Sequence, residues 1–251
     1  RAEGPGPGQA TGQATGQTPR RQTPRRQTPR RQTLRGQTWP PVSPQELQSH
    51  CLSFAARGAA ADPAHDLDHI KRVVKNATYL SDSEGVNTLI TLPAACLHDC
   101  VAVPKDSAHR AHASRLAAEA AIAFLAGLDY PPGLLPDVFH AIEAHSYSAG
   151  VAPRTAEARV VQDADRLDSL GAIGIARCLL VGGRLDRPLC AGEDPFCEQR
   201  APDDSRFTID HFYAKLLKLP ATMQTAAGRA EAERRAGIMR RYLDDLRAEI
   251  L

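Results

Sequence analysis

Apolar side chains recur three and four residues apart along most of the chain beyond residue 44, and this spacing constrains the fold more than any other feature. Such a repeat places apolar groups on one face of an α-helix, whereas a half-buried strand would alternate them. Only 5% of the residues are aromatic, and Ala and Leu dominate the hydrophobic 42%, which favours helix packing over a β-sandwich. The sequence therefore predicts an all-α fold. A representative set is Ile70, Val73, Val74, Ala77 and Leu80.

The repeat and its interruptions predict a series of helices within the body of the chain. Ser43, Pro44 and Glu46 form a capping-box start for the first of them. The predicted helices span about 44–57, 65–82, 87–100, 109–127, 134–145, 155–168, 169–181, 209–218 and 222–248.

Glycine and proline mark the breaks between these helices. Gly182-Gly183 is expected to end the helix that begins near residue 169. Pro93 is expected either to kink the third helix or to delay its start to about Leu92. Residues 183–206 are polar and proline-containing, so we expect a long surface loop there.

The first 42 residues differ from the rest in composition. The unit QTPRR repeats within residues 17–38, and residues 1–40 hold eight Arg and one Glu. This segment carries a net charge of +7, so the rest of a chain of formal charge +2 carries −5. So few apolar side chains cannot offset the entropy lost on ordering. We expect residues 1–42 to form a disordered, dispensable basic tail and residues 43–251 to form the folded domain. Nucleic-acid binding by the tail is the weaker alternative.

Cysteine usage and hydropathy indicate the cellular setting. None of the six cysteines lies in a CxxC pair, so neither a disulfide framework nor a Cys-ligated zinc is predicted. Free thiols are typical of a reducing compartment. No apolar run approaches the roughly 20 residues that a membrane span needs. We expect a cytoplasmic protein whose folded body binds neither membrane nor nucleic acid.

Four clusters of imidazole and carboxylate groups stand out in the predicted helical body. Taken singly, each has a structural explanation, such as a charged helix end or a solvated face. Their presence in one body favours a hydrolytic metal centre, because imidazole and carboxylate groups together are what such a centre uses. The clusters are "HDLDHIKRV" (65–73), His98-Asp99 at the end of "LPAACLHDC" (92–100), "HAIEAHS" (140–146) and "QDADRLDSLGAIG" (162–174).

A metalloprotease is a weaker interpretation of the first cluster. His65 and His69 have the spacing of the two histidines in the H-E-x-x-H motif, with Asp66 in the glutamate position. Aspartate is one methylene shorter and a poor substitute for that general base. This interpretation also leaves the other clusters without a role.

The order of the clusters resembles that of the HD-domain metal-dependent phosphohydrolases. The strings "HIKRVV", "AACLHD" and "DADRLDSL" follow one another between residues 69 and 170. The sequence is similar in particular to a bacterial subfamily related to nucleoside triphosphate pyrophosphohydrolases, through "HAIEAHS", "QDADRLDSLGAIGIAR" and "DHFYAKLLKLP". The likeness runs from about Asp62 to about Leu246, with Ala64 where the subfamily has Ser. The resemblance implies an HD-domain helical bundle.

The resemblance also implies a set of metal ligands: His69, His98, Asp99 and Asp165. Asp163 stays open as the alternative to Asp165, because the two are only two residues apart. Adjacent helical residues point about 100° apart, so His98 and Asp99 reach one ion only at a helix end or a distortion. Imidazole with carboxylate suits a first-row divalent ion. We expect Mn²⁺ first, with Mg²⁺, Co²⁺, Ni²⁺, Fe²⁺ and Zn²⁺ as alternatives.

Further residues are expected to act on the substrate or the attacking water. Asp66 and Glu143 are candidates to position or deprotonate that water, and His65 is a candidate to donate to the leaving group. Asp168 is expected to support a neighbouring ligand. The candidate phosphate-binding residues are Lys105, Arg110, His140 and His145.

The expected reaction is hydrolysis of a nucleoside or deoxynucleoside triphosphate to monophosphate and pyrophosphate. The alternatives are a phosphomonoesterase or phosphodiesterase acting on a nucleotide, and a non-catalytic helical module that binds one. The expected partner is a small-molecule nucleotide. The oligomeric state stays open, a dimer being one option.

Overall fold

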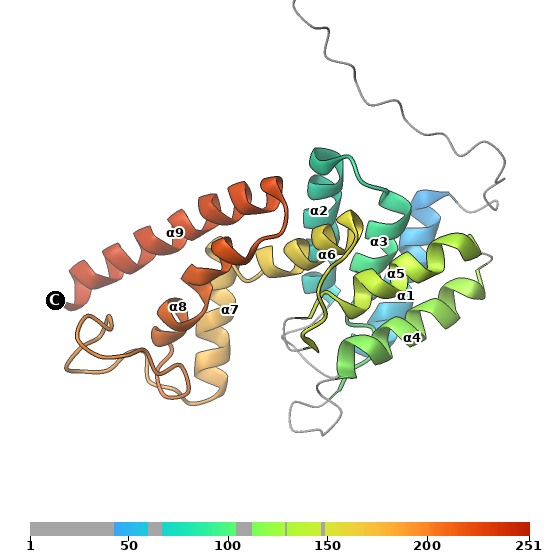
Figure 1. The fold of residues 1–251 in the computed structure, drawn as a ribbon. Coiled ribbons are helices and arrows are strands. Elements are labelled where there is room, and N and C mark those ends of the chain that lie inside the picture. Colours follow the sequence, from blue (N-terminus) through green and yellow to red (C-terminus); the bar gives the residue numbers. More distant parts are fainter. Residues whose placement is uncertain (1–42, 60–66, 104–111, 129, 147–148) are drawn as a thin grey trace, which may run out of the picture. The chain divides into compact units, whose positions relative to one another are not determined.

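The computed structural model describes residues 43–59, 67–103, 112–128, 130–146 and 149–251, and every regular element in these segments is a helix (Figure 1). The all-α prediction is confirmed for this part of the chain. The predicted basic tail, residues 1–42, lies outside the described residues. None of the described helices combines the length and apolar character that a membrane crossing requires.

The order of the helices follows the prediction. The elements are α1 (Pro44–Ala59), α2 (Leu67–Glu84), α3 (Thr88–Leu97), α4 (Ala113–Ala126), η3 (Pro132–Leu134), α5 (Leu135–Glu143), α6 (Ala156–Leu167), α7 (Gly171–Arg184), α8 (Asp210–Ala214), η5 (Leu216–Thr222) and α9 (Ala226–Ile250), where η denotes a 3₁₀ helix.

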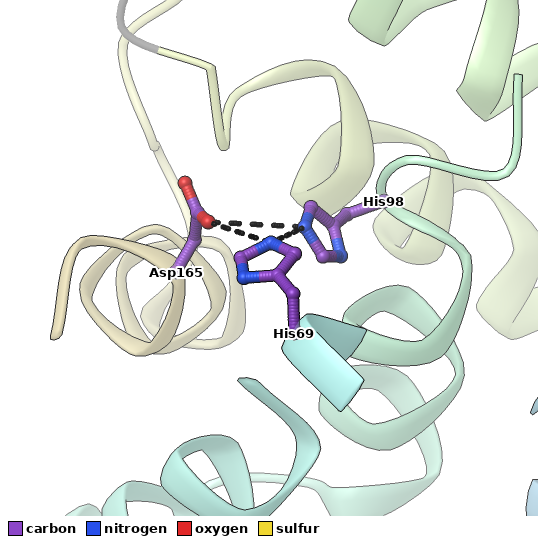
Figure 2. A group of neighbouring side chains, drawn as sticks. All are labelled: His69, His98 and Asp165. Carbon is purple, nitrogen blue, oxygen red and sulfur yellow. Dashed lines mark hydrogen bonds and ion pairs between the residues drawn. The ribbon is translucent and has the colours of Figure 1, made fainter. Parts of the chain in front are cut away.

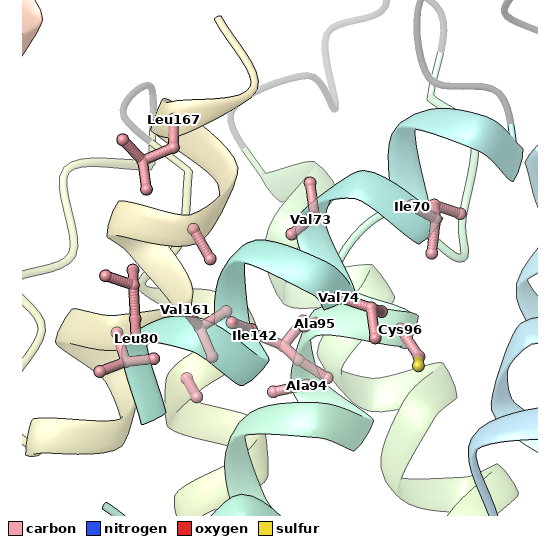
Figure 3. Close-up of a cluster of buried hydrophobic side chains, with 14 of the residues drawn as sticks. Ile70, Val73, Val74, Leu80, Ala94, Ala95, Cys96, Ile142, Val161 and Leu167 are labelled. Carbon is pink, nitrogen blue, oxygen red and sulfur yellow. The ribbon is translucent and has the colours of Figure 1, made fainter. Parts of the chain in front are cut away.

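An apolar core joins α2, α3, α5 and α6, which come from distant parts of the chain (Figure 3). The predicted apolar face of α2 is buried, and Ile142 of α5 and Val161 of α6 are fully buried as well. Small residues of α3, including Ala94 and Ala95, allow its neighbours to approach closely. Each large apolar side chain buried here stabilises the fold by about 1.5–3 kcal/mol. The core therefore fixes the ends of these helices relative to one another.

Side-chain caps set the starts of α1 and α3. Ser43 N donates to Glu46 Oε2 at 2.6 Å, and Glu46 N donates to Ser43 Oγ at 3.2 Å, so the predicted capping box is confirmed. Asn87 Oδ1 accepts from Leu89 N at 3.0 Å, and α3 begins at Thr88. Pro93 therefore lies inside α3 and does not delay its start; it removes only one hydrogen-bond donor from the helix.

The structure differs from the prediction at Gly182-Gly183 and within residues 209–218. Gly182-Gly183 does not end α7, which continues to Arg184. Gly182 is buried, and a Cβ there would lie 2.2 Å from Thr208 Oγ1, so this glycine serves close packing instead of termination. The single helix predicted at 209–218 is α8 followed by η5, because the backbone at Lys215 leaves helical geometry with φ −135°.

A buried aspartate anchors the start of α9 to α6. Asp163 accepts from Gln224 N at 2.9 Å, and from Thr225 N and Oγ1 at 2.8 and 2.7 Å. Thr225 Oγ1 also accepts from Gly228 N at 3.0 Å and so caps α9. Gly228 provides the space for this arrangement, because a Cβ there would lie 2.4 Å from Asp163 Oδ2.

Gly228→Ala is expected to lower the free energy of unfolding by about 1–3 kcal/mol, because the added methyl group must displace a buried carboxylate that is held by several hydrogen bonds. Gly237→Ala in the same helix is the matched control. Its Cβ would approach only Arg241 Nη1, at 3.8 Å, so it is expected to stabilise the helix by up to about 1 kcal/mol. Urea unfolding measures both, and equal changes in the two variants would contradict the packing argument.

Candidate metal centre

The doublet His98-Asp99 lies just beyond the end of α3. The helix ends at Leu97, His98 is its C-cap, and Cys100 N donates to Leu97 O at 3.1 Å in the turn that follows. This end comes three residues before the predicted one. The residues of α3 that precede the doublet are buried in the core, which holds the doublet in place. The turn allows both side chains to face one region, as the sequence led us to expect.

Three separate elements bring His69, His98 and Asp165 together (Figure 2). His69 lies in the first turn of α2, and Asp165 lies in the last turn of α6. His69 Nε2 is 3.3 Å from His98 Nε2 and 3.5 Å from Asp165 Oδ1. His98 Nε2 is 3.8 Å from the same oxygen. Both histidines are buried, while the Asp165 side chain keeps 29% of its exposure, so solvent reaches one side of the group.

His98 belongs to a second group, together with Asp99 and His145. His98 Nε2 lies 3.5 Å from Asp99 Oδ2, and His145 Nε2 lies 3.6 Å from Asp99 Oδ1. The His98 and His145 rings meet edge to face, with centroids 4.8 Å apart. Because the two groups share His98, five side chains surround one region. His145 was expected from the sequence to contact the substrate, and in the structure it lies in this second group, which could hold a metal ion.

Hydrogen bonds behind two of the rings determine which nitrogen faces this region. His98 Nδ1 lies 2.9 Å from Ala95 O. His145 Nδ1 lies 2.6 Å from Ile142 O. A carbonyl oxygen only accepts, so each Nδ1 carries the hydrogen and each Nε2 of a neutral ring presents a lone pair.

Asp168 determines the orientation of the third ring, His69. Its carboxylate accepts from His69 Nδ1 at 2.7 Å, from Arg72 Nε at 2.7 Å and from Arg177 Nη1 at 2.6 Å. Burial alone would raise the pKa of Asp168, but its contacts with His69, Arg72 and Arg177 outweigh burial and lower it. An ionised carboxylate only accepts, so the hydrogen of His69 stays on Nδ1 and Nε2 faces the centre.

Arg72 and Arg177 were not among the residues expected to serve the site. Arg72 follows His69 by three residues on the same helix face, a local signal that could have suggested a shared partner. Arg177 lies in the next helix, nine residues after Asp168, and the turn between α6 and α7 brings its guanidinium back to the Asp168 carboxylate.

The converging lone pairs explain why this arrangement suits a metal ion. Two Nε2 lone pairs 3.3 Å apart repel each other unless positive charge lies close by. Burial lowers the pKa of His98, which disfavours a proton as that charge. Burial also opposes the charged form of His145, but Asp99 and Asp165 outweigh it and raise its pKa, so the local field favours a cation. The described residues thus form groups that can hold a divalent metal ion.

Two other predicted site residues have different contacts. Glu143 Oε1 lies 3.6 Å from Arg115 Nη1 of α4. His140 Nε2 accepts from Arg154 N at 2.9 Å, and its buried Nδ1 has no hydrogen-bond partner among the described residues. Neither belongs to the two His/Asp groups. Four further predicted residues lie outside the described residues: His65, Asp66, Lys105 and Arg110.

The two aspartates between which the sequence could not choose face different parts of the molecule. Residues two apart on a helix point about 200° apart, so they cannot share one site. Asp165 faces His69 and His98, whereas Asp163 faces the start of α9.

Asp163→Asn is therefore expected to lower the free energy of unfolding by about 1–3 kcal/mol, because an amide cannot accept all the bonds that Gln224 N and Thr225 donate. Asp165→Asn is expected to leave metal-free stability unchanged or slightly raised, since it removes charge from a cluster of acceptors. Urea unfolding with a chelator present measures both variants. A larger loss for Asp165→Asn would reverse the assignment.

Known proteins share this arrangement of helices. The family model for the HD domain matches residues 66–170. The YpgQ protein of Bacillus subtilis (strain 168) is 30% identical over 190 residues, which is 74% of this chain and 84% of YpgQ. An HD-superfamily hydrolase from Bacillus thuringiensis superposes with a TM-score of 0.64 at 33% identity, covering 82% of this chain and 97% of that one. The crystal structure of Bacillus subtilis YpgQ in complex with ADP superposes with a TM-score of 0.63 at 28% identity, covering 81% and 97%.

The helical arrangement and the His/Asp groups define a domain of the HD-superfamily hydrolase class. The chain belongs to the HD-domain family, as its extended likeness to YpgQ and the family match show.

Proposed function

We propose that this protein is a metal-dependent phosphohydrolase that cleaves nucleoside or deoxynucleoside triphosphates to monophosphate and pyrophosphate. The convergence of three imidazole lone pairs and two carboxylates in one partly exposed region carries the proposal. The complex of the related YpgQ with ADP supports a nucleotide as the ligand class. The six unpaired cysteines agree with a cytoplasmic protein.

The proposed metal ligands are His69, His98, Asp99 and Asp165, and His145 is placed to join them. A divalent ion held there would polarise a phosphoryl oxygen and make water more acidic. Mn²⁺ remains the first choice for a set of imidazole and carboxylate donors, with the other first-row ions and Mg²⁺ as alternatives.

The chain's own residues orient these donors and supply charge beside them. Asp168 keeps the proton of His69 on Nδ1, and backbone carbonyls do the same for His98 and His145. Arg177, which contacts Asp168, adds a cation next to the site. Asp66 and Glu143 remain the proposed groups for positioning water, and His65 the proposed donor to the leaving group. Lys105, Arg110 and His140 remain proposed phosphate contacts.

The direct test is a product assay on a panel of nucleoside triphosphates with Mn²⁺. The full chain is expected to release pyrophosphate, and His98→Ala is expected to lose at least about 100-fold in kcat/KM because it removes a donor from both His/Asp groups. His50→Ala, an exposed histidine of α1, is the control and is expected to retain full activity. Orthophosphate from monophosphates would indicate a phosphomonoesterase, and no turnover with any divalent ion would indicate a binding module.

The same assay tests the proposed division of the chain. A protein comprising residues 43–251 is expected to match the full chain in kcat and KM, because the candidate donors all lie within the folded domain. A loss of activity on removing residues 1–42 would assign the basic tail a role in turnover.

Asp168→Asn is expected to weaken Mn²⁺ binding by about 10–100-fold, because an amide no longer fixes the His69 tautomer. Asp68→Asn is the matched control, since Asp68 is exposed and, among the described residues, pairs with Lys71 alone. Titration calorimetry with Mn²⁺ measures both variants, and a thermal melt checks that each is folded. Equal Mn²⁺ affinities in a folded Asp168→Asn and the wild type would refute the positioning role.

A further inference from the structure

A shallow apolar groove of about 50 Å³ lies between the first turns of α1 and the first turns of α3. These two helices pack beside each other in the domain (Figure 1). Core residues contribute to its lining, since Leu47 is 5% exposed and Cys51 and Pro93 are buried. None of the described lining residues carries a charge. Water in such a groove finds few hydrogen-bond partners, so an apolar side chain is the favoured occupant.

The size of the groove indicates what kind of occupant it suits. Pockets that enclose a small-molecule ligand usually measure about 300–1,000 Å³. This groove is several times smaller, so it suits one or two apolar side chains of a peptide segment. Leu89 and Leu92, which also line it, are only partly buried and offer further apolar surface to such a segment.

The chain itself provides an apolar segment directly before α1. Residues 39–42 read Trp-Pro-Pro-Val and follow the basic repeat. Ser43 O accepts from Leu47 N at 2.9 Å, so Ser43 is the N-cap of α1. Val42 therefore precedes the N-cap, and Leu47 is the fourth residue of the helix. Apolar residues at these two positions often pack together as a hydrophobic staple. Because Leu47 lines the groove, the staple would place Val42 there.

Trp39 is within reach of the remaining part of the groove. Four residues of extended chain span at most about 14 Å. The α1 residues that line the groove run from Pro44 to Cys51, about 10 Å along the helix axis. Pro40 and Pro41 have a fixed φ, so the segment loses less backbone entropy on docking than a flexible one would.

We propose that residues 39–42 of the chain dock in this groove. Val42 packs against Leu47, and the Trp39 ring covers Leu89. The occupant is thus a segment of the same molecule, and the folded domain begins directly after the basic repeat. Docking ties the start of α1 to α3, the helix whose C-terminal end carries the candidate metal donors.

The test uses the fluorescence of Trp39, the single tryptophan of the chain. In the folded full chain its emission is expected at a shorter wavelength than in urea, with protection from quenching by acrylamide. Leu89→Asp places a charge in the groove. It is expected to shift the emission to that of an exposed indole and to raise the acrylamide quenching constant several-fold. The first turn of α3 tolerates the new carboxylate because of the helix dipole.

Two further variants make the test specific. Leu116→Asp is the matched control, because Leu116 is an exposed leucine in the first turn of α4 and does not line the groove. Its emission is expected to equal that of the wild type. Val42→Asn leaves every groove residue in place and is also expected to raise the quenching of Trp39, so the test holds even if Leu89→Asp does not fold. Circular dichroism checks the fold of each variant.

The outcomes that would overturn the docking are distinct. One is the emission of an exposed indole in the folded wild type, and another is equal quenching in the wild type, Leu89→Asp and Val42→Asn. A short-wavelength emission that is lost on dilution would place the segment in the groove of a second molecule, which also contradicts the proposal. These readouts need neither metal nor nucleotide, so they are independent of the proposed hydrolysis.

Discussion

The orientation of three imidazole rings is the constraint on which the candidate metal centre depends. Each ring has its Nδ1–H directed at a fixed acceptor, so each Nε2 lone pair points into a common region. Two of the acceptors are backbone carbonyls near the ends of α3 and α5, and their positions follow from the fold alone. The third acceptor is Asp168, whose own position depends on Arg72 and Arg177. The orientation of the donor atoms is therefore determined by the packed helices that hold the three acceptors.

The last turns of α6 show how one short segment serves three purposes. Asp163 anchors α9, Asp165 faces the histidines, and Asp168 orients His69. Helical geometry separates Asp163 from the other two, because residues two and five apart point in clearly different directions, whereas Asp165 and Asp168 both face His69. The pKa shifts of Asp163 and Asp168 run in opposite directions. Burial outweighs the hydrogen bonds of Asp163 and raises its pKa, whereas the partners of Asp168 outweigh burial and lower its pKa.

A cavity beside α7 is lined by Arg177, Arg187, His211 and Lys215, and its shape also depends on how the neighbouring segments pack. Gly182 allows Thr208 to approach α7 closely, and this approach brings the 208–216 segment against the helix. Gly182, which was expected to help end the helix, instead lines a surface that carries several basic side chains. Arg177 lines this surface and also pairs with Asp168, the residue that orients His69.

The amino-acid sequence by itself determined the helical class, the order of the helices and the donor-rich clusters, because apolar periodicity and residue chemistry are local properties. It also anticipated that His98 and Asp99 would need a helix end, and that Asp168 would support a neighbour. It could not choose between Asp163 and Asp165, find Arg72 and Arg177 as partners of Asp168, or foresee that Gly182-Gly183 would continue a helix. Those outcomes depend on which face of a helix meets which neighbour across gaps of up to about 100 residues. Only the packed tertiary structure decides such contacts, since their energy comes from groups that are remote in sequence.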